Sequence, residues 1–304
     1  MRETQISVIG GGYVGLVTAA CFAELGHPVS VIEIDPGKAE AINAARPPIH
    51  EEGLAELLER HAGRRLSAGT TYDPLPASDL SFICVGTPSA PDGSADLSMV
   101  RAAGRSIGEA LRDLDRPHVA VVKSTVPPGT TERVVIPAVR EHSGRGDIGF
   151  SMNPEFLREG AAVADFMHPD RIVIGAGSAA AGDAVAAAYR GVDAPILRTG
   201  ITAAEMIKYA SNALLAAKIS CANEIGNLCK RLGIDAYEVL AGAGMDPRIA
   251  PRFLEAGAGF GGSCFPKDVS ALIRLAEDLG EDPCLLRSVL AVNDRQPLRM
   301  VALL

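Results

Sequence analysis

The chain has 304 residues, of which 47% are hydrophobic, and a formal net charge of −8. This length is enough for two domains with separate cores. The acidic balance argues against general binding of nucleic acids or anionic membranes. No apolar run is long enough to cross a bilayer. A strand predicted from Ile6 leaves no room for a signal peptide before it.

The cysteines form no CxxC pair and no cysteine–histidine cluster with zinc-ligand spacing, so we expect no metal. Several lie within apolar periodic segments, which is typical of reduced core residues in a cytoplasmic protein. The six are Cys21, Cys84, Cys221, Cys229, Cys264 and Cys284.

A glycine-rich motif follows the first predicted strand, residues 6–9. It reads Gly10-Gly11-Gly12-Tyr13-Val14-Gly15, and a helical pattern (16–25) and a second strand (29–34) come after it. In a G-x-G-x-x-G motif the first glycine allows the tight turn, the second lets the backbone approach a pyrophosphate, and the third allows close helix–strand packing. In this context the motif predicts a dinucleotide site.

An acid after the second strand would hold the ribose of the dinucleotide. Glu33 is placed to end that strand, and Asp35 lies in the loop beyond. A carboxylate there accepts hydrogen bonds from ribose hydroxyls and repels a 2′-phosphate, which favours NAD over NADP. Lys38 is the nearest cation; it either reaches the cofactor or is a solvated helix residue.

Further short strands, at 80–85, 119–122, 148–152, 172–174 and 195–197, alternate with helical patterns. This alternation predicts an α/β fold with a doubly wound parallel sheet. Thr87 and Thr125 follow two of the strands, at the edge where such sheets bind ligands. Threonine is also ordinary turn chemistry, so both interpretations stay open.

The stretch from Asn153 to Gly160 has the pattern of a helix start. Asn153 suits the N-cap, Pro154 the first helical position, and Glu155 and Glu159 would share one face. These acids would either stabilise the helix N-terminus or take part in proton transfer.

The second half is mainly helical, with a long pattern at 202–232 and shorter ones at 236–241, 269–279 and from 285. In the long helix, Lys208, Asn212, Ile219 and Asn223 share a face. A solvated face and a functional one are both compatible with this mixture. The glycine-rich, cationic stretch at 242–257 is long for a connection in a compact domain, which is typical of functional loops.

Cys264 lies in the segment Gly261-Gly262-Ser263-Cys264-Phe265-Pro266-Lys267-Asp268. If Pro266 opens a helix, the cysteine lies at the positive end of the helix dipole, where a thiolate nucleophile is favoured. Taken alone, a structural cysteine beside a glycine turn is the more ordinary interpretation.

Together these segments resemble the UDP-glucose/GDP-mannose dehydrogenase family, whose members oxidise a nucleotide sugar with NAD. The resemblance implies a Rossmann-type NAD-binding domain at 1–199 and a mainly α-helical dimerisation domain at 200–304, and hence a homodimer. It extends over the whole chain. The matching segments are 10–15, 85–88, 124–126, 153–160, 205–212 and 253–268.

The resemblance also implies a mechanism with two hydride transfers, which takes a primary alcohol through an aldehyde to an acid. Cys264 would add to the aldehyde as a thiohemiacetal, and Glu155 would activate water to hydrolyse the resulting thioester. Thr125 and Asp268 would orient the water or substrate, and Lys208 and Asn212 would stabilise the oxyanion.

The remaining site residues are also implied by the family. Those assigned to the cofactor are Gly10, Gly12, Tyr13, Val14, Gly15, Glu33, Lys38, Thr87, Thr125, Glu159 and Lys267. Those assigned to the sugar nucleotide are Glu155, Phe156, Leu157, Arg158, Lys208, Asn212, Arg248, Phe253, Leu254, Gly257 and Gly261.

The sugar is predicted from departures from the GDP-mannose pattern. Leu215 stands where that pattern has a histidine, and Arg252, Phe253 and Glu255 replace two tyrosines and an arginine. This favours oxidation of UDP-glucose to UDP-glucuronate. GDP-mannose, a UDP-N-acetylhexosamine and a β-hydroxyacid remain alternative substrates.

Family members continue into a third, nucleotide-binding domain, which this sequence is expected to lack. A non-catalytic NAD-binding fragment is therefore a further alternative.

Overall fold

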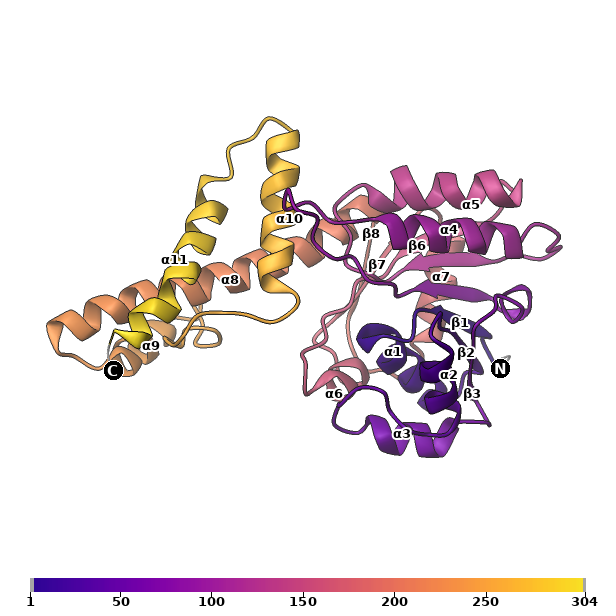
Figure 1. Cartoon of the computed structure of the whole chain (residues 1–304), viewed down its shortest axis with the longest axis horizontal. Helices are drawn as coiled ribbons and strands as arrows, with labels where there is room; N and C mark the ends of the chain where they lie inside the picture. Colours follow the sequence, from indigo (N-terminus) through magenta and orange to yellow (C-terminus); the bar gives the residue numbers. More distant parts are fainter. Residues whose placement is uncertain (1–2, 303–304) are drawn as a thin grey trace. The chain divides into compact units, whose positions relative to one another are not determined.

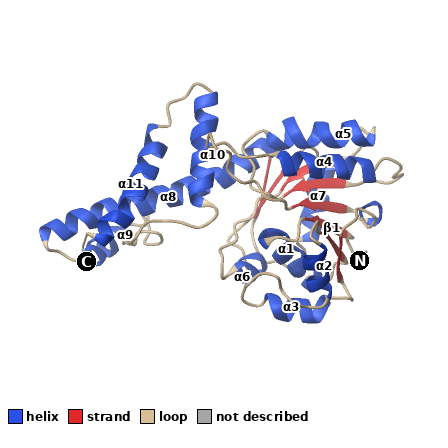
Figure 2. Ribbon diagram, in the orientation of Figure 1, coloured by secondary structure: helices blue, strands red, loops and turns tan. Residues whose placement is uncertain are grey.

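The computed structural model describes residues 3–302 and divides the chain into two compact units. The first consists of Met1–Thr87 and Asp96–Lys208, and the second of Pro88–Ala95 and Tyr209–Leu304. Figure 2 shows that the strands belong to the first unit and that the second is built of helices and loops.

The first unit contains an eight-stranded sheet with the order β3-β2-β1-β4-β5-β6-β7-β8. Neighbouring strands are parallel except β6 and β7, so β7 and β8 run against the other six. The order of the first six is that of a dinucleotide-binding sheet, which confirms the predicted fold class. The strands are β1 (Ile6–Ile9), β2 (Val29–Ile32), β3 (Leu66–Gly69), β4 (Leu80–Ile83), β5 (Val119–Val122), β6 (Gly149–Met152), β7 (Ile172–Ala176) and β8 (Ile196–Thr199).

Helices cover both faces of this sheet (Figure 1). One face carries α1 (Tyr13–Glu24), α3 (Leu54–His61), α6 (Ala162–Met167) and α7 (Ala179–Ala188). The other carries α4 (Ser98–Ala110), the π-helical turn Thr131–Val135 and α5 (Ile136–Ser143). The short α2 (Pro36–Asn43) lies against the edge strand β3.

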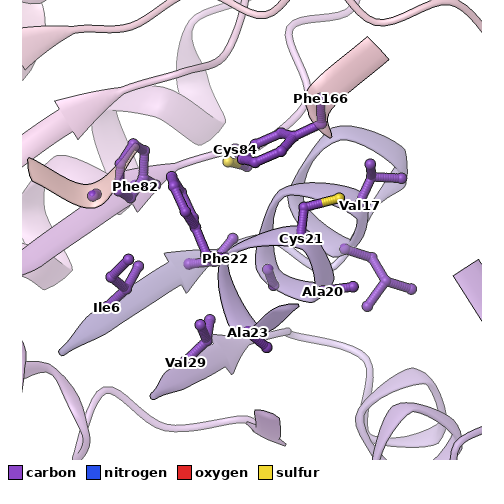
Figure 3. Close-up of a cluster of buried hydrophobic side chains, with 14 of the residues drawn as sticks. Ile6, Val17, Ala20, Cys21, Phe22, Ala23, Val29, Phe82, Cys84 and Phe166 are labelled. Atoms are coloured by element: carbon purple, nitrogen blue, oxygen red, sulfur yellow. The ribbon is translucent and has the colours of Figure 1, made fainter. Parts of the chain in front are cut away.

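The strands form here because both faces of the sheet are covered. β1, β4 and β5 are buried along their whole length, as expected of parallel strands between two helix layers. On the α1 face, Phe22 packs against Phe82 and Phe166, with ring centroids 5.0 and 5.1 Å apart (Figure 3). This core packs α1 against β1 and β4.

The second unit is built on α8 (Ile201–Leu232), whose first turns belong to the first unit. It also contains α9 (Ala236–Gly244), α10 (Phe265–Asp278) and α11 (Cys284–Val301). Its core is small and joins Ala216, Val269 and Val289 to half-buried neighbours that include Phe260. Within residues 3–302, no helix is long and apolar enough to cross a membrane.

Most predicted elements are confirmed with shifted ends, but one is wrong. No helix begins at Asn153: residues 153–161 are irregular, and α6 starts only at Ala162. Glu155 and Glu159 therefore do not share a helix face. The edge strand β3 was not predicted, because its sequence Leu66-Ser67-Ala68-Gly69 has little strand propensity.

Candidate functional site

The glycine-rich loop has the geometry that close approach of a ligand requires. Gly10 has a φ of 96°, and a Cβ there would lie 2.9 Å from the Cys84 carbonyl oxygen. A Cβ on Gly15 would lie 1.9 Å from the Gly10 carbonyl oxygen, so α1 can pack against β1 only with glycine. Gly12 is the N-cap of α1, and no protein atom lies within 4 Å of where its Cβ would be. The protein itself therefore does not require glycine at residue 12, and the open space there would admit a phosphate at the helix N-terminus.

Glu33 follows the end of β2, and its carboxylate turns back to the glycine loop. It accepts hydrogen bonds from the amides of Gly11 at 2.7 Å and Asp35 at 3.0 Å. Asp35 instead caps α2 by accepting from the amides of Gly37 and Lys38. The Asp35 side chain is thus used by its own helix, which leaves Glu33 as the candidate for the ribose. The Lys38 side chain is exposed.

Tyr13 joins the first turn of α1 to the loop that contains Arg158. Its hydroxyl donates to the Glu51 carboxylate and, at 3.2 Å, to the Arg158 carbonyl oxygen. Glu51 also accepts from the amides of Gly160 at 2.9 Å and Ala162 at 2.7 Å. Burial opposes ionisation of this acid, but the three hydrogen bonds lower the pKa of Glu51 overall. The glycine loop and residues 158–162 are therefore held together by one carboxylate.

Of the predicted site residues next to Tyr13 and in the loop at residues 157–159, some are packed in the core and others are exposed to solvent. Val14 and Leu157 pack against the main hydrophobic core. Arg158 and Glu159 are exposed, and the Arg158 guanidinium pairs with Asp165 at 2.6 Å.

Thr87 and Thr125 lie beyond the carboxyl ends of the paired strands β4 and β5. The Thr87 hydroxyl donates to the Thr125 carbonyl oxygen at 2.8 Å, and Ser124 donates to the Val85 carbonyl oxygen at 2.6 Å. These bonds join the two loops at the edge where parallel sheets bind ligands. Thr125 takes part through its backbone carbonyl and not through its half-buried side chain, which remains a candidate for contact with substrate.

Glu155 and Lys208 form a buried ion pair within the first unit. The Lys208 Nζ lies 2.9 Å from Glu155 Oε1, and both side chains are only 5% exposed. The Lys208 ammonium also lies 5.4 Å from the centre of the Phe156 ring, against which the Arg171 guanidinium stacks at 3.9 Å. A carboxylate and an ammonium at this short distance, and largely excluded from water, can exchange a proton with a bound substrate or stabilise its charge.

Asn153 has a different task from the capping role predicted for it. Its Oδ1 accepts from Lys123 Nζ at 3.1 Å and from the Tyr189 hydroxyl at 2.6 Å. Its Nδ2 donates to the Val173 carbonyl oxygen at 2.8 Å. These bonds fix the start of the loop that carries Glu155. Sequence reasoning missed Lys123, which is 3% exposed; the signal was a lysine directly after an apolar strand, at its ligand-binding end.

In the second unit, Cys264 is the N-cap of α10, with Pro266 in the first turn. This confirms the predicted helix start and places the half-buried thiol at the positive end of a helix dipole. Lys267 Nζ lies 2.5 Å from the Asp268 carboxylate, which also accepts from Asn212 Nδ2 at 2.6 Å. Asp268 is 1% exposed, so its charge is compensated by an ammonium and an amide.

The loop between α9 and α10 contains the other residues predicted to bind substrate. Arg248 is exposed and pairs with Asp246 at 2.6 Å. Phe253 has a φ of 65°, which is uncommon for a bulky residue. Leu254 and Gly257 are half-buried and Gly261 is exposed. Within the described residues, no group of three or more His, Cys, Asp or Glu residues could hold a metal ion.

Comparison with known proteins agrees with both parts of this arrangement. Residues 4–193 match the model of the UDP-glucose/GDP-mannose dehydrogenase family, NAD binding domain. Residues 202–295 match the central domain of the same family. The chain belongs to the UDP-glucose/GDP-mannose dehydrogenase family. It is thus an NAD-dependent nucleotide-sugar dehydrogenase, and the β-hydroxyacid alternative is not supported.

Relatives of this family match along almost the whole chain. A UDP-glucose 6-dehydrogenase of Haloferax volcanii is 50% identical over 99% of this chain and 72% of its own length. The structure of a UDP-glucose dehydrogenase from Pyrobaculum islandicum has a TM-score of 0.97 at 50% identity, and the match covers all of this chain and 71% of that one. A GDP-mannose dehydrogenase from Pseudomonas aeruginosa has a TM-score of 0.79 at 42% identity, over 96% of this chain and 69% of that one.

Proposed function

We propose that this protein oxidises UDP-glucose to UDP-glucuronate in two steps, with Cys264 as the covalent nucleophile. The observation that carries the proposal is the half-buried thiol at the N-terminus of α10, beside the Lys267–Asp268–Asn212 cluster. An alcohol oxidation that stopped at the aldehyde would need no thiol. A thiol that adds to the aldehyde keeps it bound and presents a second hydride for transfer.

The proposed steps use the residues that the family resemblance assigns to catalysis. The loop of Gly10, Gly12 and Gly15 would hold two NAD molecules in succession, and each would supply the acceptor for one hydride. The first hydride leaves the primary alcohol carbon while its hydroxyl proton passes to a base. The Cys264 thiol then adds to the aldehyde, and its proton passes to the former carbonyl oxygen. Loss of the second hydride from carbon, together with that hydroxyl proton, converts the thiohemiacetal to a thioester.

Hydrolysis of the thioester releases the acid and restores the thiol. Glu155 is the proposed base that removes a proton from the attacking water, which Thr125 and Asp268 orient. Lys208 and Asn212, one turn apart on α8, stabilise the oxyanion of the tetrahedral intermediate. The buried position of the Glu155–Lys208 pair supports these roles, because charges act more strongly where water is excluded.

The substrate assignment rests on similarity. The chain is 50% identical to a UDP-glucose enzyme and 43% identical to a GDP-mannose 6-dehydrogenase of Pseudomonas syringae pv. tomato. The GDP-mannose relative makes GDP-mannose the second candidate. The chain spans 64–72% of the length of the UDP-glucose relatives it matches, and a non-catalytic NAD-binding role is the remaining alternative.

The expected result with UDP-glucose and NAD is two NADH for each UDP-glucuronate formed. A panel of UDP-glucose, GDP-mannose and UDP-N-acetylglucosamine, followed by absorbance at the NADH wavelength and by chromatography of the sugar product, measures both quantities. No NADH from any of the three, together with calorimetric binding of NAD, would favour the non-catalytic alternative. One NADH per sugar would contradict the two-step proposal.

We also propose that the protein is a cytoplasmic homodimer that associates through the helical domain. Several large apolar side chains of α8 and α9 are exposed, among them Leu214, Leu228, Leu232 and Tyr237, each more than 60% exposed. An exposed apolar surface of this kind is typical of a subunit interface. Sedimentation equilibrium should give twice the chain mass, and a monomer at micromolar concentration would contradict the proposal.

A further inference from the structure

The loop that precedes Cys264 is held by three side-chain amides from two helices. Asn223 on α8 accepts from the Gly257 amide at 2.7 Å, and Gln296 on α11 donates to the Gly257 carbonyl oxygen at 2.8 Å. Asn293 on α11 accepts from the Phe260 amide at 2.7 Å and donates to the Phe260 carbonyl oxygen at 3.0 Å. We call Asn223, Asn293 and Gln296 the amide clamp.

The side chains of the amide clamp are largely buried in the second unit. Asn223 and Gln296 are 0% and 1% exposed, and Asn227 donates to Gln296 Oε1 at 2.8 Å, which orients that amide. Buried amides cost free energy unless their hydrogen bonds are made. Both polar atoms of the Asn293 and Gln296 side chains are paired, and Asn223 is paired through Oδ1, whereas its buried Nδ2 has no partner among the described residues. The backbone is fitted to the clamp: Gly259 has a φ of 102°, and a Cβ there would lie 2.6 Å from Asn293 Oδ1.

Asn293 is connected to Cys264 through Phe260. The Phe260 side chain packs into the core of the second unit, and its ring lies 5.9 Å from the Phe265 ring in an edge-to-face contact. Phe260 is four residues before Cys264, and Phe265 is the residue after it. The backbone before the thiol and the first residue of α10 after it are thus held by the same residue.

We propose that Asn293 is a positioning residue for Cys264. By pairing with both backbone groups of Phe260, it keeps the short glycine-rich connection at 261–263 in one conformation and sets the direction of the thiol at the N-terminus of α10. This inference rests on the proposed nucleophilic role of Cys264, but the position of the thiol can be tested without any turnover. Asn293 is proposed to act through the Phe260 backbone and not by contact with substrate or cofactor.

The test measures how fast iodoacetamide alkylates Cys264 in the folded protein. Cys221 and Cys284 are exposed, so both are first replaced by serine; Cys21, Cys84 and Cys229 are buried. In this background, Asn293→Ala should speed alkylation at least threefold. The loop before Cys264 would become more mobile, and the half-buried thiol would be accessible to the reagent for more of the time. Mass spectrometry of the peptide that contains Cys264 gives the rate, and hydrogen exchange at Phe260 should rise with it.

The first unit offers a matched control. Asn43 pairs with both backbone groups of Ala68, with two distances of 2.8 Å, in the same way as Asn293 pairs with Phe260. Asn43→Ala should lower the melting temperature without changing the Cys264 alkylation rate more than 1.5-fold. Asn293→Asp keeps the acceptor for the Phe260 amide but loses the donor to its carbonyl oxygen, so its alkylation rate should lie between those of wild type and Asn293→Ala. If Asn293→Ala does not fold, the comparison is made with Asn293→Asp.

The two proposals fail in different ways. An alkylation rate of Cys264 in folded Asn293→Ala or Asn293→Asp that equals the control rate overturns the positioning role, whatever the melting temperature does. For an active protein, Asn293→Ala should also lower kcat at least tenfold while KM for NAD stays within twofold. If wild-type protein forms no uronate, the proposed function fails, whereas the alkylation comparison still decides the role of Asn293.

Discussion

Cys264→Ser is expected to reduce formation of the sugar acid by at least about 10³-fold, a loss of about 4 kcal/mol of transition-state stabilisation. A cysteine thiol is intrinsically a much stronger nucleophile toward an aldehyde than a serine hydroxyl. The first oxidation needs no thiol, so the variant should accumulate aldehyde and give one NADH per sugar. Hydroxylamine trapping of the aldehyde, with chromatography of the sugar products, measures this partition.

Cys284→Ser is the control for this experiment. Cys284 is exposed at the start of α11 and has no part in the proposed reaction, so its replacement should leave both NADH equivalents unchanged. Wild-type rates of acid formation in Cys264→Ser would remove the thiol from the mechanism. Water addition to a bound aldehyde would then be the second step.

The parts of the site that sequence alone predicted are those with a local cause. Glycine is required at Gly10 by the backbone just after β4, and at Gly15 by the Gly10 carbonyl just after β1. The spacing of the motif reflects these close contacts. Pro266 and Asp268 mark the start of α10, so the place of Cys264 at a helix N-terminus followed from neighbouring residues. Each of these features depends on a few consecutive residues.

The wrong prediction at Asn153 has the opposite cause. A local pattern favours a helix N-cap, but the side chain is bound by Lys123, Tyr189 and Val173, which come from other elements of the sheet domain. Three tertiary hydrogen bonds outweigh a cap that contributes about 1 kcal/mol. A pattern of neighbouring residues contains no information on hydrogen-bond partners that are distant in the sequence.

The amide clamp was missed for the same reason. Asn293 lies 33 residues from Phe260, and Gln296 lies 39 residues from Gly257. An asparagine or glutamine in a helical pattern has no feature that distinguishes a buried clamp from a solvated side chain. Only the packing of α11 against the loop reveals the difference.

The second large effect is expected at the Glu155–Lys208 pair. Lys208→Met leaves a buried carboxylate without its cation, which typically costs about 3–5 kcal/mol of folding free energy. Glu155→Gln leaves the buried ammonium with a neutral partner and should destabilise the protein in the same direction. The double variant Glu155→Gln/Lys208→Met removes both charges and should recover most of the loss. Urea unfolding of the four proteins gives the coupling free energy.

An exposed pair is the matched control for this cycle. Arg274 and Asp278 pair at 2.8 Å on α10 with side chains 42% and 54% exposed, so Arg274→Met should cost no more than about 0.5 kcal/mol. Activity measurements separate the two roles of the pair. The double variant should fold well yet form no more than about a hundredth of the wild-type acid, because removing one hydrogen-bond donor to an oxyanion typically costs about 10²–10³ in kcat. A double variant that is both stable and fully active would show that the pair holds the fold together and takes no part in the oxidation.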